Sequence, residues 1–502
     1  MVVKSERVLN VWAFSRRHSF FLLIILAASV YAALAPRFYV GYFGDDARDI
    51  LAARSLLHGS YSDWQQPSHP PLNFPLPGFP LLLAPWTALL VRALGWLRLI
   101  PILSTLGSLF FLRKLFEPHF STSAAFSACM ALFAFNPATL AYSTFVISDA
   151  SYLFFMAWVL VLYCDEPQPQ TGGKKWLLGG ALACVALLRP EGMILMLAIF
   201  MARLSERHWK SAVVALSLPG IGLGSWFLRN VKATGTISGY SSLWAEAFTF
   251  LRAGFWPWFS YEKELGQKLF LDLILGISMP VVGSFQAALA SVIVLLVIVV
   301  LARGIWRTAH VAEVPRWFLV TSLYTCGHLL LHAVWPAADP HYLWPLLPFL
   351  LFFIVQGASR GMLWIMAALY LWQGMYALNA VFQKAATNQL PAKTLAWIAT
   401  ETPKDSYFLA PNASLITLYT GRCALALIRA RNAEDFYGQL QHRGITHILV
   451  MPPRFLYLHQ ANGPSPEKAW WRIALTASLT PAKYAALYQD STEQSLVYRV
   501  KK

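Results

Sequence analysis

Long apolar runs follow one another through the first three quarters of the chain and constrain its fold more than any other feature. Hydrophobic residues make up 57% of the 502 residues, and charged residues only 13%. A helix needs about 20 mostly apolar residues to cross a bilayer. The runs predict a mainly α, polytopic transmembrane helical bundle with about eleven spans, near residues 19–35, 98–112, 121–141, 149–164, 176–188, 191–203, 211–228, 283–302, 317–335, 342–357 and 361–379.

A further apolar segment, residues 72–93, is expected not to cross the membrane as a regular helix. It contains Pro75, Pro77, Pro80 and Pro85. Proline inside a helix removes a backbone hydrogen bond and clashes with the preceding turn. We therefore predict a broken element, partly re-entrant or juxtamembrane, of the kind that membranes tolerate only where other protein covers the backbone.

The positions of Lys and Arg predict how the spans are oriented. If residues 72–93 do not cross, each short loop on the N-terminal side is basic, as Arg113-Lys114 and Lys174-Lys175 illustrate, whereas the opposite loops are nearly neutral. Cytoplasmic loops carry an excess of Lys and Arg. The first loop and the C-terminal region are therefore expected outside the cytoplasm. These basic loops, together with five cysteines that form no disulfide pattern, favour a bacterial inner membrane.

The net charge of +16 could also indicate a nucleic-acid partner. The basic residues, however, are scattered between apolar runs, and a nucleic-acid site requires a dense basic patch. We therefore predict no nucleic-acid partner.

The first loop carries an unusual density of acidic residues: Asp45, Asp46 and Asp49 lie within five positions. If Gly44 opens a helix, Asp45 and Asp46 fall in its first turn, where the helix dipole favours negative charge. The helix would bury one face, including Leu57, against a membrane surface and stop at Gly59. The acids either form a functional site or only cap and solvate this helix.

Two further groups of polar residues lie in apolar surroundings. The turn Arg189-Pro190-Glu191-Gly192 joins two short spans, so an Arg and a Glu are placed at membrane depth. Such residues mark a functional site or a mutual ion pair that holds a helical hairpin together. His328 and His332 are four residues apart, on one face of a helix. They either ligate a metal or form a satisfied polar pair in the helical core.

An aromatic-rich loop, near residues 230–280, is expected at the level of the lipid headgroups. Its rings could instead line a groove for a sugar or a lipid chain.

After residue 384 the long apolar runs cease and charged residues recur. The chain is therefore expected to divide into a membrane domain, residues 1–384, and an extracytoplasmic soluble α/β domain, residues 385–502. Short strand-like runs are found at Tyr407–Ala410, Ala424–Ile428, Ile445–Val450 and Leu496–Val500. Residues 432–443 read as a helix capped by Asn432.

Five motifs occur in the order and spacing of one family. The chain resembles the polyprenyl-phosphate-dependent membrane glycosyltransferases of the GT-C type, which include protein O-mannosyltransferases and the aminoarabinose transferase of lipid A. The motifs are Gly44-Asp45-Asp46-Ala47-Arg48-Asp49, His69-Pro70-Pro71-Leu72, Leu97-Arg98-Leu99, Ile147-Ser148-Asp149-Ala150 and His341-Tyr342-Leu343-Trp344-Pro345. The resemblance covers most of residues 10–380. Ser148 departs from the family's usual Pro, and His69 from the Lys of the lipid A enzymes.

The resemblance implies roles for these residues. The catalytic candidates are the acidic residues Asp45, Asp46 and Asp149, and either Asp45 or Asp46 would act as the base. The candidates for binding the donor phosphate are His69, Arg98, Arg189, His341 and Tyr342. Members need no nucleotide, but some relatives use a divalent metal cation, which Asp45 and Asp149 would hold here.

The function expected from the resemblance is that of an inverting glycosyltransferase, a hexosyl- or pentosyltransferase. It would move a sugar from a polyprenyl-phosphate donor to a hydroxyl of a protein or a glycolipid such as lipopolysaccharide, on the outer face of the membrane. The alternatives are a transporter or flippase of lipid-linked sugars and a catalytically inactive scaffold. A transporter would be expected to show paired internal repeats and charges near mid-span, and the sequence shows neither.

Overall fold

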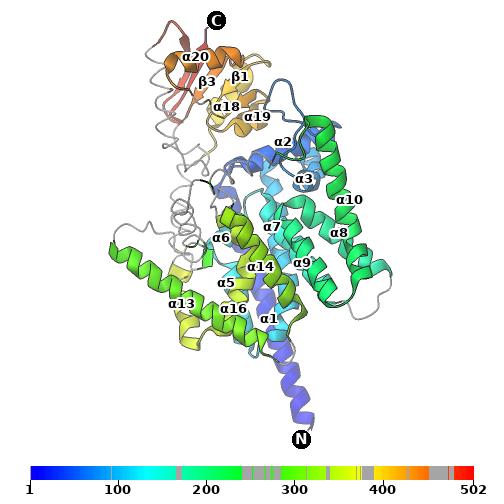
Figure 1. Cartoon of the computed structure of the whole chain (residues 1–502). Coiled ribbons are helices and arrows are strands. Elements are labelled where there is room, and N and C mark those ends of the chain that lie inside the picture. The colour runs from blue at the N-terminus through cyan, green and yellow to red at the C-terminus, as the bar shows by residue number, and fades with distance from the viewer. Residues whose placement is uncertain are drawn as a thin grey trace. The chain divides into compact units, whose positions relative to one another are not determined.

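The computed structural model is mostly helical, with one five-stranded sheet near the C-terminus (Figure 1). It describes residues 2–91, 93–165, 172–239, 284–311, 314–334, 340–368, 370–372, 389–426, 430–451 and 480–501, with a few single residues between these ranges. Contacts divide the chain into two compact units. The first unit comprises Met1–Ala35, Leu76–Phe79 and Arg98–Ala380, and the second comprises Pro36–Pro75, Pro80–Leu97 and Val381–Lys502.

The first unit contains most of the apolar helices, and the mainly helical class predicted from the apolar runs is confirmed. Its helices are α1 (Val2–Leu34), α4 (Leu99–Phe116), α5 (Ser123–Ala134), α6 (Pro137–Tyr142), α7 (Ser148–Cys164), α8 (Gly172–Leu188), α9 (Glu191–Ser205), α10 (Trp209–Thr234), α13 (Ser284–Ala309), α14 (Arg316–Val334), α15 (Pro340–Leu343) and α16 (Leu347–Gly357).

Four helices of the described chain are long and apolar enough to cross a membrane: His18–Arg37, Leu94–His119, Trp209–Thr234 and Ser291–Ala309. The predicted span at 361–379 lies partly outside the described residues, as does most of the aromatic loop at 230–280. The chain is a membrane protein, and the number of eleven spans stays a prediction.

The expected continuous span at 121–141 is wrong, because α5 ends and α6 begins within it. Asn136 caps α6 by accepting a hydrogen bond from the N–H of Ala138, and Pro137 is the first residue of α6. The Asn136 amide also donates to the Leu273 carbonyl at 2.7 Å. A proline at this position cannot continue the helix before it, so the chain turns here.

The proline-rich segment forms a short helix, α3 (Gly78–Leu89), followed by a 3-10 turn at Leu94–Arg98. With 12 residues, α3 is about 18 Å long at 1.5 Å per residue. This is shorter than the hydrocarbon core of about 30 Å. Pro85 lies inside this helix, and the non-crossing arrangement of the segment stays a prediction.

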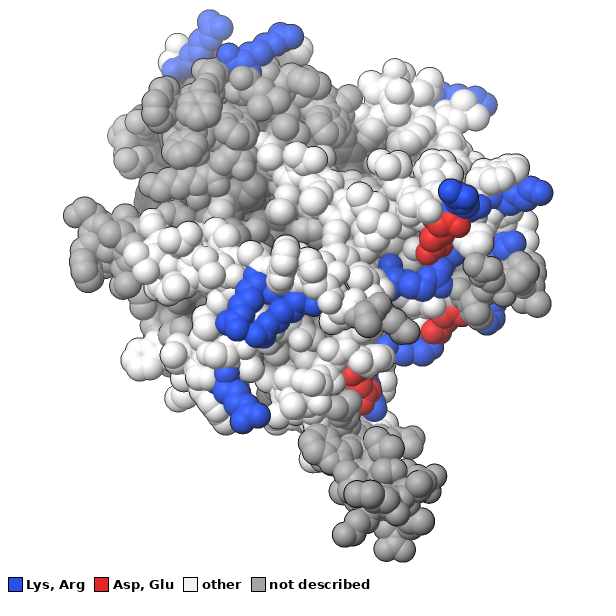
Figure 2. Space-filling model, turned by 60° about the horizontal axis from the view of Figure 1, so that its bottom comes forward, with Lys and Arg blue, Asp and Glu red and all other residues white. Residues whose placement is uncertain are grey.

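Loops that the charge pattern assigns to one side meet at one end of the first unit. Lys114 pairs with Asp165, Arg316 donates to Glu206 at 3.0 Å, and the amide of Gln356 donates to the His119 carbonyl. These contacts join helix ends far apart in sequence, and the alternation of the spans stays a prediction. Figure 2 shows Lys and Arg dispersed over one face in separate groups, without one continuous basic patch.

The predicted topology can be tested with reporter fusions. A reporter after Asn379 and one inserted near Asp63 are expected outside the cytoplasm, and one near Gly172 inside, because Lys and Arg are retained on the cytoplasmic side. Alkaline phosphatase and green fluorescent protein fusions would measure this. Finding Asp63 and Gly172 on the same side would contradict the model.

The second unit contains the sheet, in the order β2-β1-β3-β5-β4. β1 pairs in parallel with β2 and β3, whereas β5 pairs antiparallel with β3 and β4. The strands are β1 (Tyr407–Leu409), β2 (Cys423–Leu425), β3 (His447–Val450), β4 (Tyr484–Asp490) and β5 (Ser495–Val500). The four predicted strands are therefore present, and β4 was missed. Its residues are largely exposed along one edge of the sheet, so it lacks a clear apolar alternation.

Helices cover both faces of this sheet. Successive strand residues point to opposite faces, so Leu409 and Ile448 pack with Phe436 and Leu440 of α20 (Ala433–His442). The other face packs against α18 (Ala392–Glu401) and α19 (Ala413–Thr420). The helix predicted after Asn432 is confirmed as α20, with the Asn432 side chain capping it.

Candidate functional site

The acidic loop begins the helix predicted for it, α2 (Asp45–Leu57), and places Asp46 inside the protein. Gly44, with a φ of 88°, turns the chain immediately before the helix. Asp46 is 1% exposed, and its carboxylate accepts three backbone hydrogen bonds, from Gly41 at 2.6 Å and from Gly44 and Ala47 at 2.9 Å. Burial raises the pKa of Asp46 to about 6, although these N–H donors act in the opposite direction. Asp46 therefore holds the loop together.

Asp45 is placed differently. Its side chain is 30% exposed and pairs with the guanidinium of Arg48 at 3.1 Å. The Arg48 guanidinium in turn lies over the ring of Phe74, at 4.5 Å from its centre. Of the two adjacent carboxylates, Asp45 is the one that solvent or a substrate can reach.

The expected buried face of α2 is partly wrong. Ile50 and Ala53 are fully buried, but Leu57 is 48% exposed. Asp46 and Asp49 are buried instead. The helix therefore packs its buried residues within the second unit, and its contact with a membrane surface stays a prediction.

The C-terminal domain holds the acidic loop through hydrogen bonds within the second unit. The Asn412 amide donates to the Gly41 carbonyl at 3.0 Å, and the Tyr419 hydroxyl donates to the Val40 carbonyl at 2.9 Å. The Ala424 N–H of β2 donates to the Gln65 carbonyl at 2.9 Å. Asn412 also caps α19 and is 2% exposed. The sequence Asn412-Ala413-Ser414 therefore offers no accessible amide for N-glycosylation.

Replacing Asn412 by Ala is expected to destabilise the protein by about 1–2 kcal/mol through loss of the α19 cap and to loosen the loop that carries Asp45. The matched control is Asn432→Ala, because Asn432 caps α20 in the same domain and makes no described contact with the loop. Thermal unfolding and limited proteolysis within residues 41–71 would be measured. Equal loop protection in the two variants would contradict a holding role for Asn412.

His69 and Arg98 lie in separate units. His69, in the second unit, is exposed at a φ of 45°, in a turn closed by the bridge between Ser62 and Pro71. Its ring lies 6.3 Å from that of Trp64. Arg98, in the first unit, ends the 3-10 turn before α4 and is partly buried.

A buried ion-pair network forms the polar centre of the first unit. Arg189 donates to Asp149 through Nη1, and to both carboxylate oxygens of Glu191, at 2.9 Å from Nη2 and 3.2 Å from Nε. All three residues are at most 5% exposed. The predicted ion pair across the α8–α9 turn is therefore present, and Asp149 at the start of α7 joins it.

Aromatic rings and histidines surround this network. The Arg189 guanidinium lies 5.5 Å from the centre of the Tyr342 ring, which stacks on His332 at 5.4 Å. His341 is 4% exposed, and its ring lies 3.9 Å from that of Tyr342. The motif at 341–345 therefore lies beside Arg189. The order of the motifs in the sequence did not reveal this contact.

His328 is linked by hydrogen bonds to the hydroxyl group of one tyrosine and through it to that of a second. This group was not identified from the sequence. Its Nε2 lies 2.9 Å from the Tyr342 carbonyl, and its Nδ1 lies 3.0 Å from the Tyr324 hydroxyl. The Tyr324 hydroxyl is also 3.0 Å from that of Tyr152. The available signal was spacing, because Tyr324 precedes His328 by four residues and Tyr152 follows Asp149 by three.

The structure thus brings Asp149, Arg189, His341 and Tyr342 together in the first unit, and Asp45 and Asp46 in the second.

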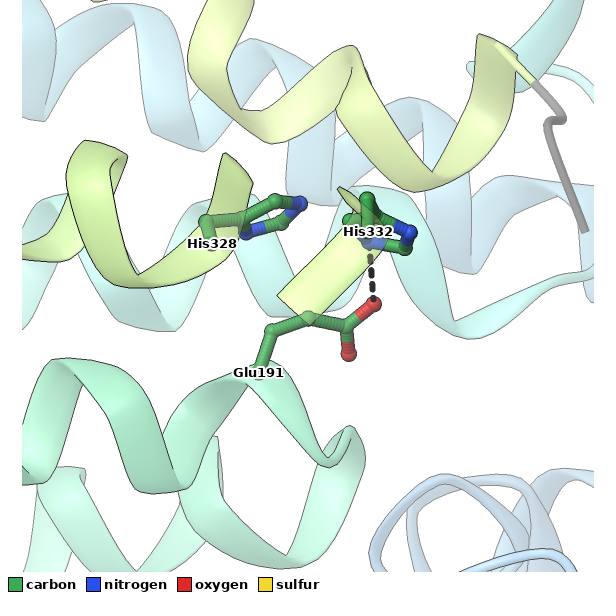
Figure 3. A group of neighbouring side chains, drawn as sticks. All are labelled: Glu191, His328 and His332. Atoms are coloured by element: carbon green, nitrogen blue, oxygen red, sulfur yellow. Dashed lines mark ion pairs between the residues drawn. The ribbon is translucent and has the colours of Figure 1, made fainter. Parts of the chain in front are cut away.

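The candidate metal ligands can be compared by their partners and by the distances between their ligand atoms. Asp45 and Asp149 each pair with an arginine. Among the described residues, Glu191, His328 and His332 form a group of metal-ligand type, with ligand atoms within 4.8 Å of one another (Figure 3).

No family model matches the sequence, and no curated protein matches it. Solved structures do match. The oligosaccharyltransferase of Archaeoglobus fulgidus, in complex with Zn and sulfate, has a TM-score of 0.54 at 13% identity, over 95% of this chain and 72% of that chain. AglB from the same organism, with an inhibitory peptide and a dolichol-phosphate, has a TM-score of 0.52 at 11% identity, over 95% and 74%. ArnT from Cupriavidus metallidurans, bound to undecaprenyl phosphate, has a TM-score of 0.46 at 14% identity, over 95% and 97%.

The two similarities to the oligosaccharyltransferase show the fold. The chain shares this fold, and the family that its motifs resemble stays a proposal.

Proposed function

We propose that this protein is an inverting glycosyltransferase of the GT-C type that uses a polyprenyl-phosphate sugar as donor and works on the outer face of a bacterial inner membrane. The observation that carries the proposal is the fold, which the chain shares with an oligosaccharyltransferase that was solved with a dolichol-phosphate. The exposed carboxylate of Asp45, on a loop with the family's motif, supplies the chemical group that such a reaction needs.

In the proposed reaction, the oxygen of an acceptor hydroxyl attacks the anomeric carbon of the donor sugar. Asp45 accepts the hydroxyl proton as the new C–O bond forms. The bond between the anomeric carbon and the phosphate oxygen breaks, and polyprenyl phosphate leaves with the bonding electron pair. Asp46 is less suited to the base role, because its carboxylate is buried and already accepts three backbone hydrogen bonds that shape the loop.

The leaving phosphate gains negative charge, so preorganised donors around it lower the barrier. We assign this role to Arg98, His69, His341 and Tyr342. We assign Arg189 a different role, because its guanidinium already lies between the carboxylates of Asp149 and Glu191. It positions these two residues and the aromatic ring of Tyr342.

A divalent cation held by Asp45 and Asp149 stays a prediction from the family resemblance. Such a cation would offset charge on the donor phosphate. It would also have to compete with Arg48 and Arg189, which pair with these carboxylates here.

Glycosyl transfer can be tested directly with purified protein in detergent. A panel of polyprenyl-phosphate sugars would be incubated with glycolipid and peptide acceptors, and the release of polyprenyl phosphate would be measured. Release that depends on both protein and acceptor supports the proposal. Transmembrane movement of a labelled donor in proteoliposomes, without any release, would instead identify a flippase.

Arg98 tests the phosphate assignment. Replacing Arg98 by Ala is expected to weaken donor binding and turnover, and Lys should restore only part of both. The reason is that a guanidinium grips a phosphate by two hydrogen bonds, which an ammonium cannot reproduce. Donor KM and kcat would be measured for both variants. A fully active Arg98→Ala protein would indicate that Arg98 has an interfacial or structural role instead.

A further inference from the structure

A group of three potential metal ligands lies where α9 meets α14, in contact with Arg189 and Tyr342 of the candidate site. Glu191 is in the first turn of α9, and His328 and His332 are one turn apart on α14. All three are buried, at most 3% exposed. One ligand atom from each lies within 4.8 Å of the others, and Figure 3 shows both rings on the side of α14 that faces Glu191.

The close approach of the two helices explains how the group forms. A Cβ at Gly327 would lie 2.5 Å from a side-chain carbon of Ile194, so only glycine lets α14 pack this closely on α9. Residues at i and i+4 face the same side of a helix. Gly327 therefore brings a matched pair of imidazoles to the start of α9.

Two histidines and a glutamate are the donor set of many zinc sites, in which a fourth position stays open. Imidazole ligands favour zinc, copper, iron and nickel, whereas magnesium and calcium prefer oxygen ligands. The group differs in this respect from Asp45 and Asp149, which offer oxygen atoms alone.

Neighbouring groups fix the orientation of two of these ligands, Glu191 and His328, as a metal site requires. Metal-bound carboxylates and imidazoles usually have a second partner that fixes their orientation. Glu191 receives both hydrogen bonds from Arg189, and a carboxylate keeps further lone pairs for a metal. His328 contacts the Tyr342 carbonyl and the Tyr324 hydroxyl. A metal would replace one of these contacts, and Tyr324 would still have Tyr152 as a partner.

Charge also favours a cation here. Asp149 and Glu191 carry two negative charges when ionised, and Arg189 supplies one positive charge. Buried charges are normally paired or coordinate a metal. A metal ion would offset the remaining negative charge, and the Nε2 of His332 lies 3.8 Å from Glu191.

We propose that Glu191, His328 and His332 bind a divalent transition-metal cation such as Zn²⁺, which stabilises the packing of α9 against α14. The role proposed for the cation is structural, namely to stabilise the junction of two helices, and its test does not depend on glycosyl transfer.

The test uses the full chain in detergent, purified through a tag without histidines. Metal content would be measured after dialysis against Zn²⁺ and then against metal-free buffer, together with the melting temperature and the visible absorption of the Co²⁺-loaded protein. We expect about one ion per chain, as for a single closed or open zinc site, and a higher melting temperature in its presence. The variants His328→Gln and His332→Gln should lose both effects.

The matched control is His310→Gln, because His310 is exposed in the turn that follows a different helix, α13. It should bind the ion as the unsubstituted protein does. If the variants fail to fold, the Co²⁺ spectrum of the unsubstituted chain still decides, since imidazole ligation in a tetrahedral site gives intense visible bands. An unsubstituted protein that retains no metal, or variants that retain as much as the control, would overturn the proposal and leave Glu191, His328 and His332 as a polar cluster between the two helices.

Discussion

Replacing Asp45 by Asn is expected to lower the rate of glycosyl transfer by roughly 10²- to 10⁴-fold, the range typical of a lost general base. Asn keeps the shape of the side chain but neither its charge nor its basicity. Because Asp45 is partly exposed and its one described ion pair is with Arg48, the folded protein should survive the change. Product formation and the melting temperature would be measured side by side.

Asp46→Asn serves as the comparison, and it should behave in the opposite way. Both oxygens of Asp46 accept backbone N–H groups, and an amide would turn its NH₂ toward one of those donors. Leaving a buried donor unsatisfied costs about 1–3 kcal/mol. We therefore expect the main loss in stability for Asp46→Asn and in rate for Asp45→Asn.

The outcome also separates an enzyme from a transporter. Asp149→Asn completes the set, because Asp149 is the third acidic candidate. Near-normal turnover in all three variants would rule out the base mechanism proposed here. A lipid-linked sugar transporter would then be the better account.

Replacing Arg189 by Met is expected to have the largest effect on stability. The change leaves the carboxylates of Asp149 and Glu191 buried without the cation that now lies between them. Removing one partner of a buried ion pair typically costs about 3–5 kcal/mol. The melting temperature and the yield of folded protein in detergent should both fall steeply.

The control is Arg113→Met, which breaks the ion pair of Arg113 with Glu117 at a partly exposed position. Such pairs contribute about 0.2–1 kcal/mol, so this variant should unfold close to the unsubstituted protein. Combining Arg189→Met with Asp149→Asn and Glu191→Gln should recover part of the lost stability, because the buried charges are then gone. An Arg189→Met protein of normal stability would instead return Arg189 to the donor phosphate.

Local features of the fold were predictable because their causes are local. Apolar runs indicate membrane helices, Gly44 and Gly59 bracket α2, and Asn432 caps α20. Apolar strand runs placed four of the five strands. The break between α5 and α6 was missed although Asn136 and Pro137 are a recognisable helix start, since the apolar composition continues across it.

The sequence by itself determined the helical class, many of the described elements, the motifs and the chemical types of the candidate residues. Only the tertiary structure decided which of these groups meet. In the tertiary structure, Asp46 accepts backbone hydrogen bonds and Asp45 stays accessible. Arg189 pairs with Asp149, 40 positions away, and Glu191 lies close to the two histidines of α14. The physical reason is that capping and periodicity depend on neighbours within a turn or two. The pairing of buried charges depends instead on how distant helices pack, because the low dielectric of the interior makes each unpaired charge costly.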